Sequence, residues 1–146
     1  MKLTSLALLV LALTTPAAYA DSSKAAATSI SGTWNNTVTH HGYSINKKGI
    51  VGRNPAVCDG RYEQVFSLEK GDKWLTDAEA LAKDKTISKS QYDALAKEID
   101  RTRDYPQLRS GCGESSDHFI LINPEAMVSM ACAEGNCQVI RHVRAH

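Results

Sequence analysis

The N-terminal segment decides how much of this chain can take part in the fold. Lys2 is followed by an apolar run from Leu3 to Leu13, and Ala18-Tyr19-Ala20 has the small-x-small pattern of a signal peptidase site. The apolar run, about 11 residues, is too short for a membrane-spanning helix, which needs about 20. We therefore predict a signal peptide over residues 1–20, cleavage after Ala20, and a mature protein in the periplasm or outside the cell.

Export gives the four cysteines of the chain a structural role, because an even number of cysteines in an oxidising compartment favours disulfides. Cys132 and Cys137 flank Ala-Glu-Gly-Asn, a composition typical of a tight turn. On a hairpin these two residues would face each other at a distance that a disulfide can bridge. We predict this bridge and, by elimination, a second one between Cys58 and Cys112, whose loop of about 50 residues would contribute roughly 4 kcal/mol.

The charge of the mature protein argues against two classes of partner. Lys2 is the only charged residue of the predicted signal peptide, so the net charge of +1 falls to about zero after cleavage. A dedicated nucleic-acid binder normally carries a basic excess, as does a protein that adsorbs to anionic membranes. We expect neither partner. Since no later segment is apolar enough to cross a bilayer, we also expect no stable membrane insertion after cleavage.

The rest of the chain divides into a short leader and one domain. Residues 21–29 are small and polar, which predicts a flexible leader before a single domain over 30–146. Residues 40–56 contain several Gly and Pro breakers, and 110–117 are polar, so we expect loops there. Strand patterns cover five segments: 30–39, 61–68, 118–122, 127–132 and 137–143.

Two capping boxes predict short helices in the middle of the chain. The first runs from Thr76 to Glu79 and the second from Ser88 to Gln91, with the second helix ending near Thr102. Strands at both ends with helices between them indicate the α+β class. The expected architecture is a small antiparallel sheet, made of a C-terminal three-strand meander plus N-terminal strands, with a short helix–turn–helix pair and disulfide staples.

One short stretch has a familiar pattern. The stretch from Ile30 through Gly32 to Trp34 resembles the opening strand of lipocalin and avidin barrels. The resemblance ends there, because two helices are predicted where those families have continuous hairpins. We carry no activity or binding residue over from it.

Histidines supply the candidate chemistry. His40-His41-Gly42 could act as acid and base in a small secreted hydrolase, or hold a metal ion. A second metal alternative is a zinc site formed by His118, Cys132, Cys137 and His142. The sequence has no Gly-x-Ser-x-Gly, phosphate-binding loop or His-Glu-x-x-His motif. We assign no catalytic residue and no cofactor, and leave open whether the protein is an enzyme, with binding favoured.

A basic and apolar segment favours the binding interpretation. Apolar residues Ile45, Ile50 and Val51 occur there together with basic ones, a mixture typical of interfaces. The candidate binding residues are His40, His41, Tyr43, Lys47, Lys48, Arg53 and Arg61. The hypothesis is an exported binding protein whose partner is another protein, such as an inhibitor or immunity protein acting on a secreted toxin or cell-wall hydrolase. This last step is an analogy with small exported proteins.

Overall fold

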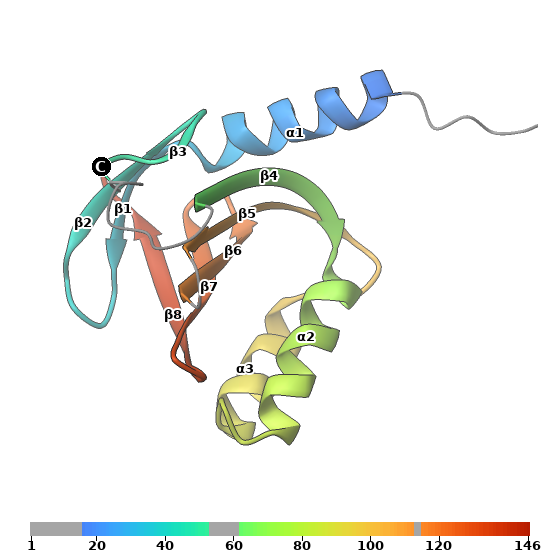
Figure 1. The fold of residues 1–146 in the computed structure, drawn as a ribbon, viewed down its shortest axis with the longest axis vertical. Coiled ribbons are helices and arrows are strands. Elements are labelled where there is room, and N and C mark those ends of the chain that lie inside the picture. The colour runs from blue at the N-terminus through green and yellow to red at the C-terminus, as the bar shows by residue number, and fades with distance from the viewer. Residues whose placement is uncertain (1–15, 53–61, 113–114) are drawn as a thin grey trace, which may run out of the picture.

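The computed structural model describes residues 16–52, 62–112 and 115–146 and confirms the α+β class (Figure 1). Its N-terminal part comprises α1 (Pro16–Ile30), β1 (Gly32–Asn36), β2 (Gly42–Asn46), β3 (Gly49–Ile50) and β4 (Tyr62–Lys70). A helix pair follows, with α2 (Gly71–Lys83) and α3 (Lys89–Glu98). The chain ends with β5 (Asp104–Cys112), β6 (Ser115–Asn123), β7 (Ala126–Ala133) and β8 (Asn136–Arg144).

The described strands form one antiparallel sheet of eight strands, larger than the small sheet expected from the sequence. Its strand order is β3-β2-β1-β8-β7-β6-β5-β4. Strands that follow each other in the chain are therefore neighbours, except β3 and β4, which form the two edges, and β1 pairs with β8. The sheet curls so that its two edges, β3 and β4, approach each other. The helix pair lies between β4 and β5 in the chain and leaves this order uninterrupted.

A side chain joins the two edges of the sheet. The backbone N–H of Ile50 on β3 donates to Oε1 of Gln64 on β4 at 2.9 Å. Gly49 has φ +119°, and a Cβ atom there would lie 2.1 Å from Gln64 Oε1. This conformation favours glycine, and any side chain at position 49 would have to move the Gln64 amide away from Ile50.

We expect Gly49→Ala to destabilise the protein more than Gly135→Ala. Both positions have positive φ, but a Cβ at Gly135 would meet no atom within 4 Å. The left-handed backbone costs each variant about 1–2 kcal/mol, and only Gly49→Ala must also displace Gln64. Urea unfolding measures both losses. Equal losses would show that the hydrogen bond between Ile50 on β3 and Gln64 on β4 does not contribute to the free energy of unfolding.

The curled sheet buries side chains on both faces. On the inner face, residues from strands at opposite ends of the sheet meet in one cluster: Trp34, Ile45, Phe66, Leu108, Phe119, Leu121 and Met127. On the outer face α2 and α3 pack against Tyr105, Ile120, Ile122, Val128 and Met130. Successive residues of a strand point to opposite faces, so β6 supplies apolar residues alternately to the two clusters.

Helix α1 corrects the prediction of a flexible leader over residues 21–29. These residues are helical, and Ala26, Ala27 and Ile30 are buried in the inner cluster. No stripe of large apolar residues marks this segment, but small alanine side chains let the helix approach β4 and β5 closely. Residues 17–20, the described end of the predicted signal peptide, are exposed.

Trp34 and Arg144 join α1 to the sheet. Trp34 Nε1 donates to the carbonyl of Ile30 at 2.9 Å. The guanidinium of Arg144 lies 4.3 Å from the centre of the Trp34 ring and donates to the carbonyls of Ser29 and Ser31. These bonds satisfy carbonyls at the C-terminal end of α1, which have no partners within a helix.

The two capping boxes have different outcomes. The box at Ser88 and Gln91 is confirmed and begins α3. The box at Thr76 is wrong, because α2 already begins at Gly71 and the Thr76 hydroxyl donates to the carbonyl of Asp72 inside the helix. The true start is set by long-range bonds: the Gly71 and Asp72 N–H groups donate to carbonyls of the turn after α3.

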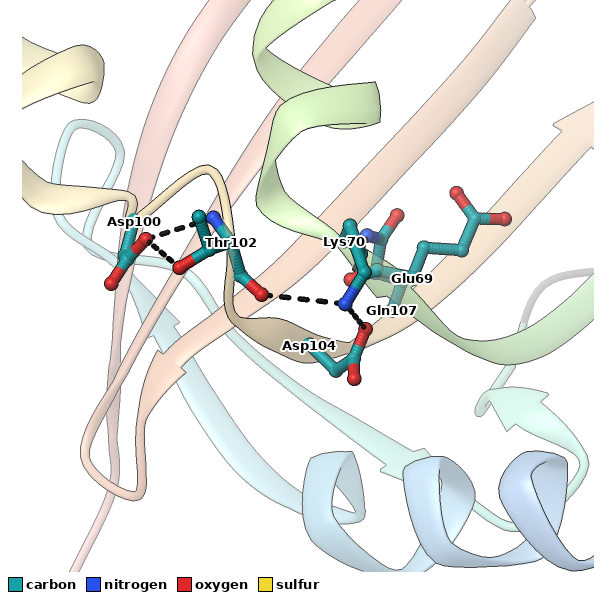
Figure 2. Close-up of polar contacts among 6 residues, drawn as sticks. All are labelled: Glu69, Lys70, Asp100, Thr102, Asp104 and Gln107. Atoms are coloured by element: carbon teal, nitrogen blue, oxygen red, sulfur yellow. Dashed lines mark hydrogen bonds and ion pairs between the residues drawn. The ribbon is translucent and has the colours of Figure 1, made fainter.

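The turn after α3 also explains why that helix ends at Glu98 and not near Thr102. One carboxylate oxygen of Asp100 accepts from both the backbone N–H and the hydroxyl of Thr102, each at 2.8 Å (Figure 2). Lys70 then bridges the Thr102 carbonyl and the Asp104 carboxylate, each at 3.3 Å. This side-chain turn replaces the last predicted helical turn.

Two predicted loops are strands. Within residues 40–56 the structure has β2 and β3, and the predicted loop 110–117 belongs to the ends of β5 and β6. Gly42 and Gly49, which resemble loop breakers in the sequence, lie in β2 and in the edge strand β3. Among the described residues no helix is long and apolar enough to cross a bilayer.

Candidate functional sites

The first candidate site is a pocket on the inner face of the sheet, which we call the inner pocket. Its volume is about 250 Å³. Aromatic and aliphatic side chains form most of its wall, and several polar groups converge on it. It is lined by Asn36, His41, Tyr43, Ile50, Asp117, Phe119, Ser129, Ile140 and His142.

A buried histidine forms the floor of this pocket. His142 is 4% exposed, and its Nδ1 lies 2.8 Å from the Tyr43 hydroxyl. Its Nε2 lies 2.8 Å from the hydroxyl of Ser129, which is 1% exposed. The three side chains come from β8, β2 and β7, and the Tyr43 ring meets the imidazole edge-on at 5.4 Å. Both ring nitrogens are therefore occupied.

Burial lowers the pKa of His142 to about 4. The imidazole is therefore neutral at pH 7, with one donor and one acceptor nitrogen. Either Tyr43 donates to it and it donates to Ser129, or the direction is reversed. A base with so low a pKa is a weak proton acceptor at neutral pH. The hydrogen bonds of His142 to Tyr43 and Ser129 therefore hold these side chains in place, but they do not make Ser129 a strong nucleophile.

The structure separates the two adjacent histidines of the sequence. His41 lines the inner pocket together with His142. His40, with φ +57°, lines a neighbouring hollow with Asn35, Thr37 and Val143. The two imidazoles therefore face different hollows and not one shared site.

The remaining predicted binding residues divide into three groups. Tyr43 lines the inner pocket. Lys47 and Lys48 are exposed in the turn between β2 and β3. Arg53 and Arg61 lie outside the described residues.

The expected exposed apolar segment is largely buried. Ile45 is 3% exposed and Ile50 packs against the inner cluster, whereas Val51 is 53% exposed. The prediction that these three residues form an apolar surface is therefore wrong for Ile45 and Ile50. They are core residues because β2 and β3 turn one side toward the inside of the curled sheet.

The bonding of the cysteines tests the predicted zinc site. Cys132 and Cys137 are paired in register between β7 and β8 and joined by the predicted disulfide. Cys112 is also disulfide-bonded, and its predicted partner, Cys58, lies outside the described residues. His142 belongs to the inner face, whereas His118 lies against Trp74 on the outer face. The zinc alternative is therefore wrong, and the described residues contain no cluster of three possible metal ligands.

The second candidate site, the outer cleft, is larger and more open. Its volume is about 630 Å³, and β4, β5 and β6 form most of it. Its lining includes Glu63, Val65, Ser67, Glu69, Asp77, Arg109, Ser116, Asp117 and His118, with Tyr19 and Ser22 of α1. The helix pair covers the neighbouring part of the outer face but leaves this part uncovered.

A second neutral histidine lies in the outer cleft. His118 Nε2 donates to Oε1 of Gln107, whose amide nitrogen reaches the Glu69 carbonyl at 3.4 Å. Burial lowers the pKa of His118 to about 3, and the charges of Arg109 and Lys73 contribute to this lowering. This histidine is a fixed hydrogen-bond donor and carries no charge at pH 7.

Sequence patterns identify few of the residues in either site. Ser129, Gln107, Glu69 and Arg109 show no feature beyond strand alternation, and the sequence offers His118 and His142 only as zinc ligands. A polar residue in an apolar strand is a weak hint of a buried network, but it does not identify the partner.

Comparisons with known proteins found no match, since no protein family model, no curated protein and no solved structure is similar to this chain.

Proposed function

We propose that this chain is an exported binding protein that takes one side chain of a partner protein into the inner pocket. The observation that carries this proposal is the pocket itself, with its floor fixed by Tyr43, His142 and Ser129. At about 250 Å³ it is smaller than the roughly 300–1,000 Å³ typical of small-molecule sites. A pocket of this size suits a single large side chain that anchors an interface.

The surroundings of the pocket support a protein partner. His41 is exposed at the rim, and His40 lies beside it in the same turn. Phe119 and Ile140 offer an apolar wall, while Asn36 supplies a polar group. An anchor with an apolar body and a polar tip, such as tyrosine or tryptophan, matches this lining. The disulfide in the β7–β8 hairpin limits the entropy lost when a partner binds.

The hydrolase alternative is the weaker one on chemical grounds. A Ser–His contact at 2.8 Å is the geometry of an activated nucleophile. However, Ser129 is almost completely buried and the pKa of His142 is about 4. A substrate would have to reach a hydroxyl at the bottom of the pocket, where the base is poorly matched to neutral pH.

Photo-crosslinking captures the partner in place and so tests the proposal directly. We expect a photoreactive residue, His41→p-benzoylphenylalanine, to give a discrete adduct when the exported protein is irradiated in its own compartment. The same residue at Lys97, which is exposed on α3, is the matched control and should give none. An excess of unlabelled protein should suppress the adduct, and mass spectrometry identifies the partner. Equal adducts from both positions, or none from position 41, would contradict the proposal.

If the partner is an enzyme, its activity gives a second test. An inhibitor should lower the turnover of the captured enzyme in proportion to occupancy. An immunity protein should protect cells from a captured toxin. If the activity of the captured partner is unchanged, the protein is a binding protein but not an inhibitor of that partner.

A further inference from the structure

We propose that the outer cleft is a second binding site, which holds the carboxylate of a zwitterionic amino acid or peptide through Arg109. The proposal is independent of the inner pocket because it rests on Arg109, which does not line that pocket, although Asp117 lines both sites. It starts from the state of the Arg109 side chain, which lies in the middle of β5 and lines the cleft.

The guanidinium of Arg109 has N–H groups that its contact with Glu69 does not use. Its side chain is 46% exposed, and its ion pair with Glu69 spans 3.6 Å, longer than a hydrogen bond. A guanidinium carries five N–H donors in a planar fork that matches a carboxylate. The cross-strand neighbour His118 does not use them, since it donates to Gln107 instead. The fork can therefore take an incoming anion.

The floor of the cleft has a positive balance. Glu69 lies between two cations, with its Oε2 3.5 Å from Lys73 and 3.6 Å from Arg109. This oxygen is buried and has no hydrogen-bond partner. Lys73 does not itself line the cleft, but its charge lies against Glu69, so one carboxylate between two cations leaves one positive charge, and neutral His118 adds none. A monoanion is therefore favoured at this point.

The rim of the cleft has the opposite sign. Asp77 is exposed at the rim on α2 and lines the cleft. A phosphate with two charges would meet this acidic rim and be repelled. A ligand with a carboxylate at one end and an ammonium at the other matches both parts. Free amino acids and short peptides have this chemistry.

The cleft has room for such a ligand. With Tyr19 of the predicted signal peptide still in place, its volume of about 630 Å³ is within the usual range for small-molecule sites. The hydroxyls of Ser67 and Ser116 lie along the same wall, where they can donate to the second carboxylate oxygen. The Ser67 hydroxyl now bonds to Glu69 Oε1 at 3.3 Å, a long bond that a ligand can replace.

Titrations followed by amide NMR test this site on the exported protein. The probes are alanine, dialanine, dialanine amide and inorganic phosphate at equal ionic strength. We expect dialanine to shift the signals of residues 109, 116 and 118. We expect at least about tenfold weaker binding of its amide, because charge-assisted bonds contribute roughly 1.5–3 kcal/mol. Tighter binding of alanine than of dialanine assigns the site to free amino acids, and the reverse order to peptide C-termini.

Variants decide whether Arg109 carries the binding. Arg109→Gln should lose at least about tenfold in affinity for dialanine, and Arg109→Lys should fall between, because it keeps the charge and loses the fork. Arg103→Gln, outside the cleft, is the matched control and should bind as the unmodified protein does. The proposal is overturned if no zwitterion shifts these signals, if phosphate binds more tightly than dialanine, or if Arg109→Gln binds as well as the control.

Discussion

Replacing Trp34 by alanine is expected to lower the free energy of unfolding by about 4 kcal/mol, the usual range for a fully buried aromatic residue being roughly 3–5. Trp34 has no exposed surface and lies in the inner cluster between α1 and the sheet. The substitution also removes the hydrogen bond to the Ile30 carbonyl and the stacking surface under Arg144. The loss should therefore reach beyond the cavity and loosen α1. Urea denaturation measures the first effect, and hydrogen exchange of α1 amides measures the second.

Two variants make this result interpretable. Trp34→Phe keeps an aromatic ring but loses the N–H donor, so its loss should be intermediate. Val38→Ala, close by in the chain and 71% exposed, should change the stability by no more than about 0.5 kcal/mol. A loss below about 1 kcal/mol for Trp34→Ala, well under the usual range for such a site, would mean that α1 does not depend on the inner cluster.

The second large effect is a loss of stability in mild acid. Burial lowers the pKa of His142 from 6.5 to about 4 in the folded protein. Between these two values the unfolded chain binds a proton that the folded protein does not, so the free energy of unfolding falls as pH falls. Below about pH 4 both states are protonated and this contribution stops growing. Its full size is on the order of 3 kcal/mol.

The substitution His142→Gln isolates this contribution. Glutamine can still hydrogen-bond but does not titrate, so the stability of the variant should depend less on pH between 6.5 and about 4. The matched control is Gln138→Ala, an exposed position on β8 that carries no titrating group, and its slope should match that of the unmodified protein. Denaturant midpoints at several pH values provide the measurement. An unchanged slope in His142→Gln would show that this histidine is not held neutral. His118, with a folded pKa of about 3, should add a similar loss.

Local signals predicted local features well. The box at Ser88 begins α3 because both of its reciprocal bonds lie within one turn. The Cys132–Cys137 bridge follows from a short hairpin. The three C-terminal strand segments fall on β6, β7 and β8. In each case the determining contacts lie close together in the chain.

Features set by distant residues were not predictable. Gly49 resembles a loop breaker, yet it is required where β3 meets Gln64 of β4. The residues before Ile30 resemble a leader, yet two alanines pack against the inner cluster. The candidate site shows the same limit. Tyr43 was identified, but His142 lies 99 positions away and reaches it only because β1 pairs with β8.

Burial on both faces has a consequence for how the strands find their alignment. In a sheet with one wet face, a one-residue slip exposes the apolar side chains and is rejected on that ground. In β6 a slip would exchange Phe119 and Leu121 with Ile120 and Ile122, apolar for apolar. The burial of apolar side chains in β6 therefore does not distinguish the correct alignment from one shifted by a single residue. The polar residues do not, because a slip would take His118 away from Gln107 and leave buried groups unpaired. The histidines proposed to frame two binding sites thus also make one alignment of the strands the stable one.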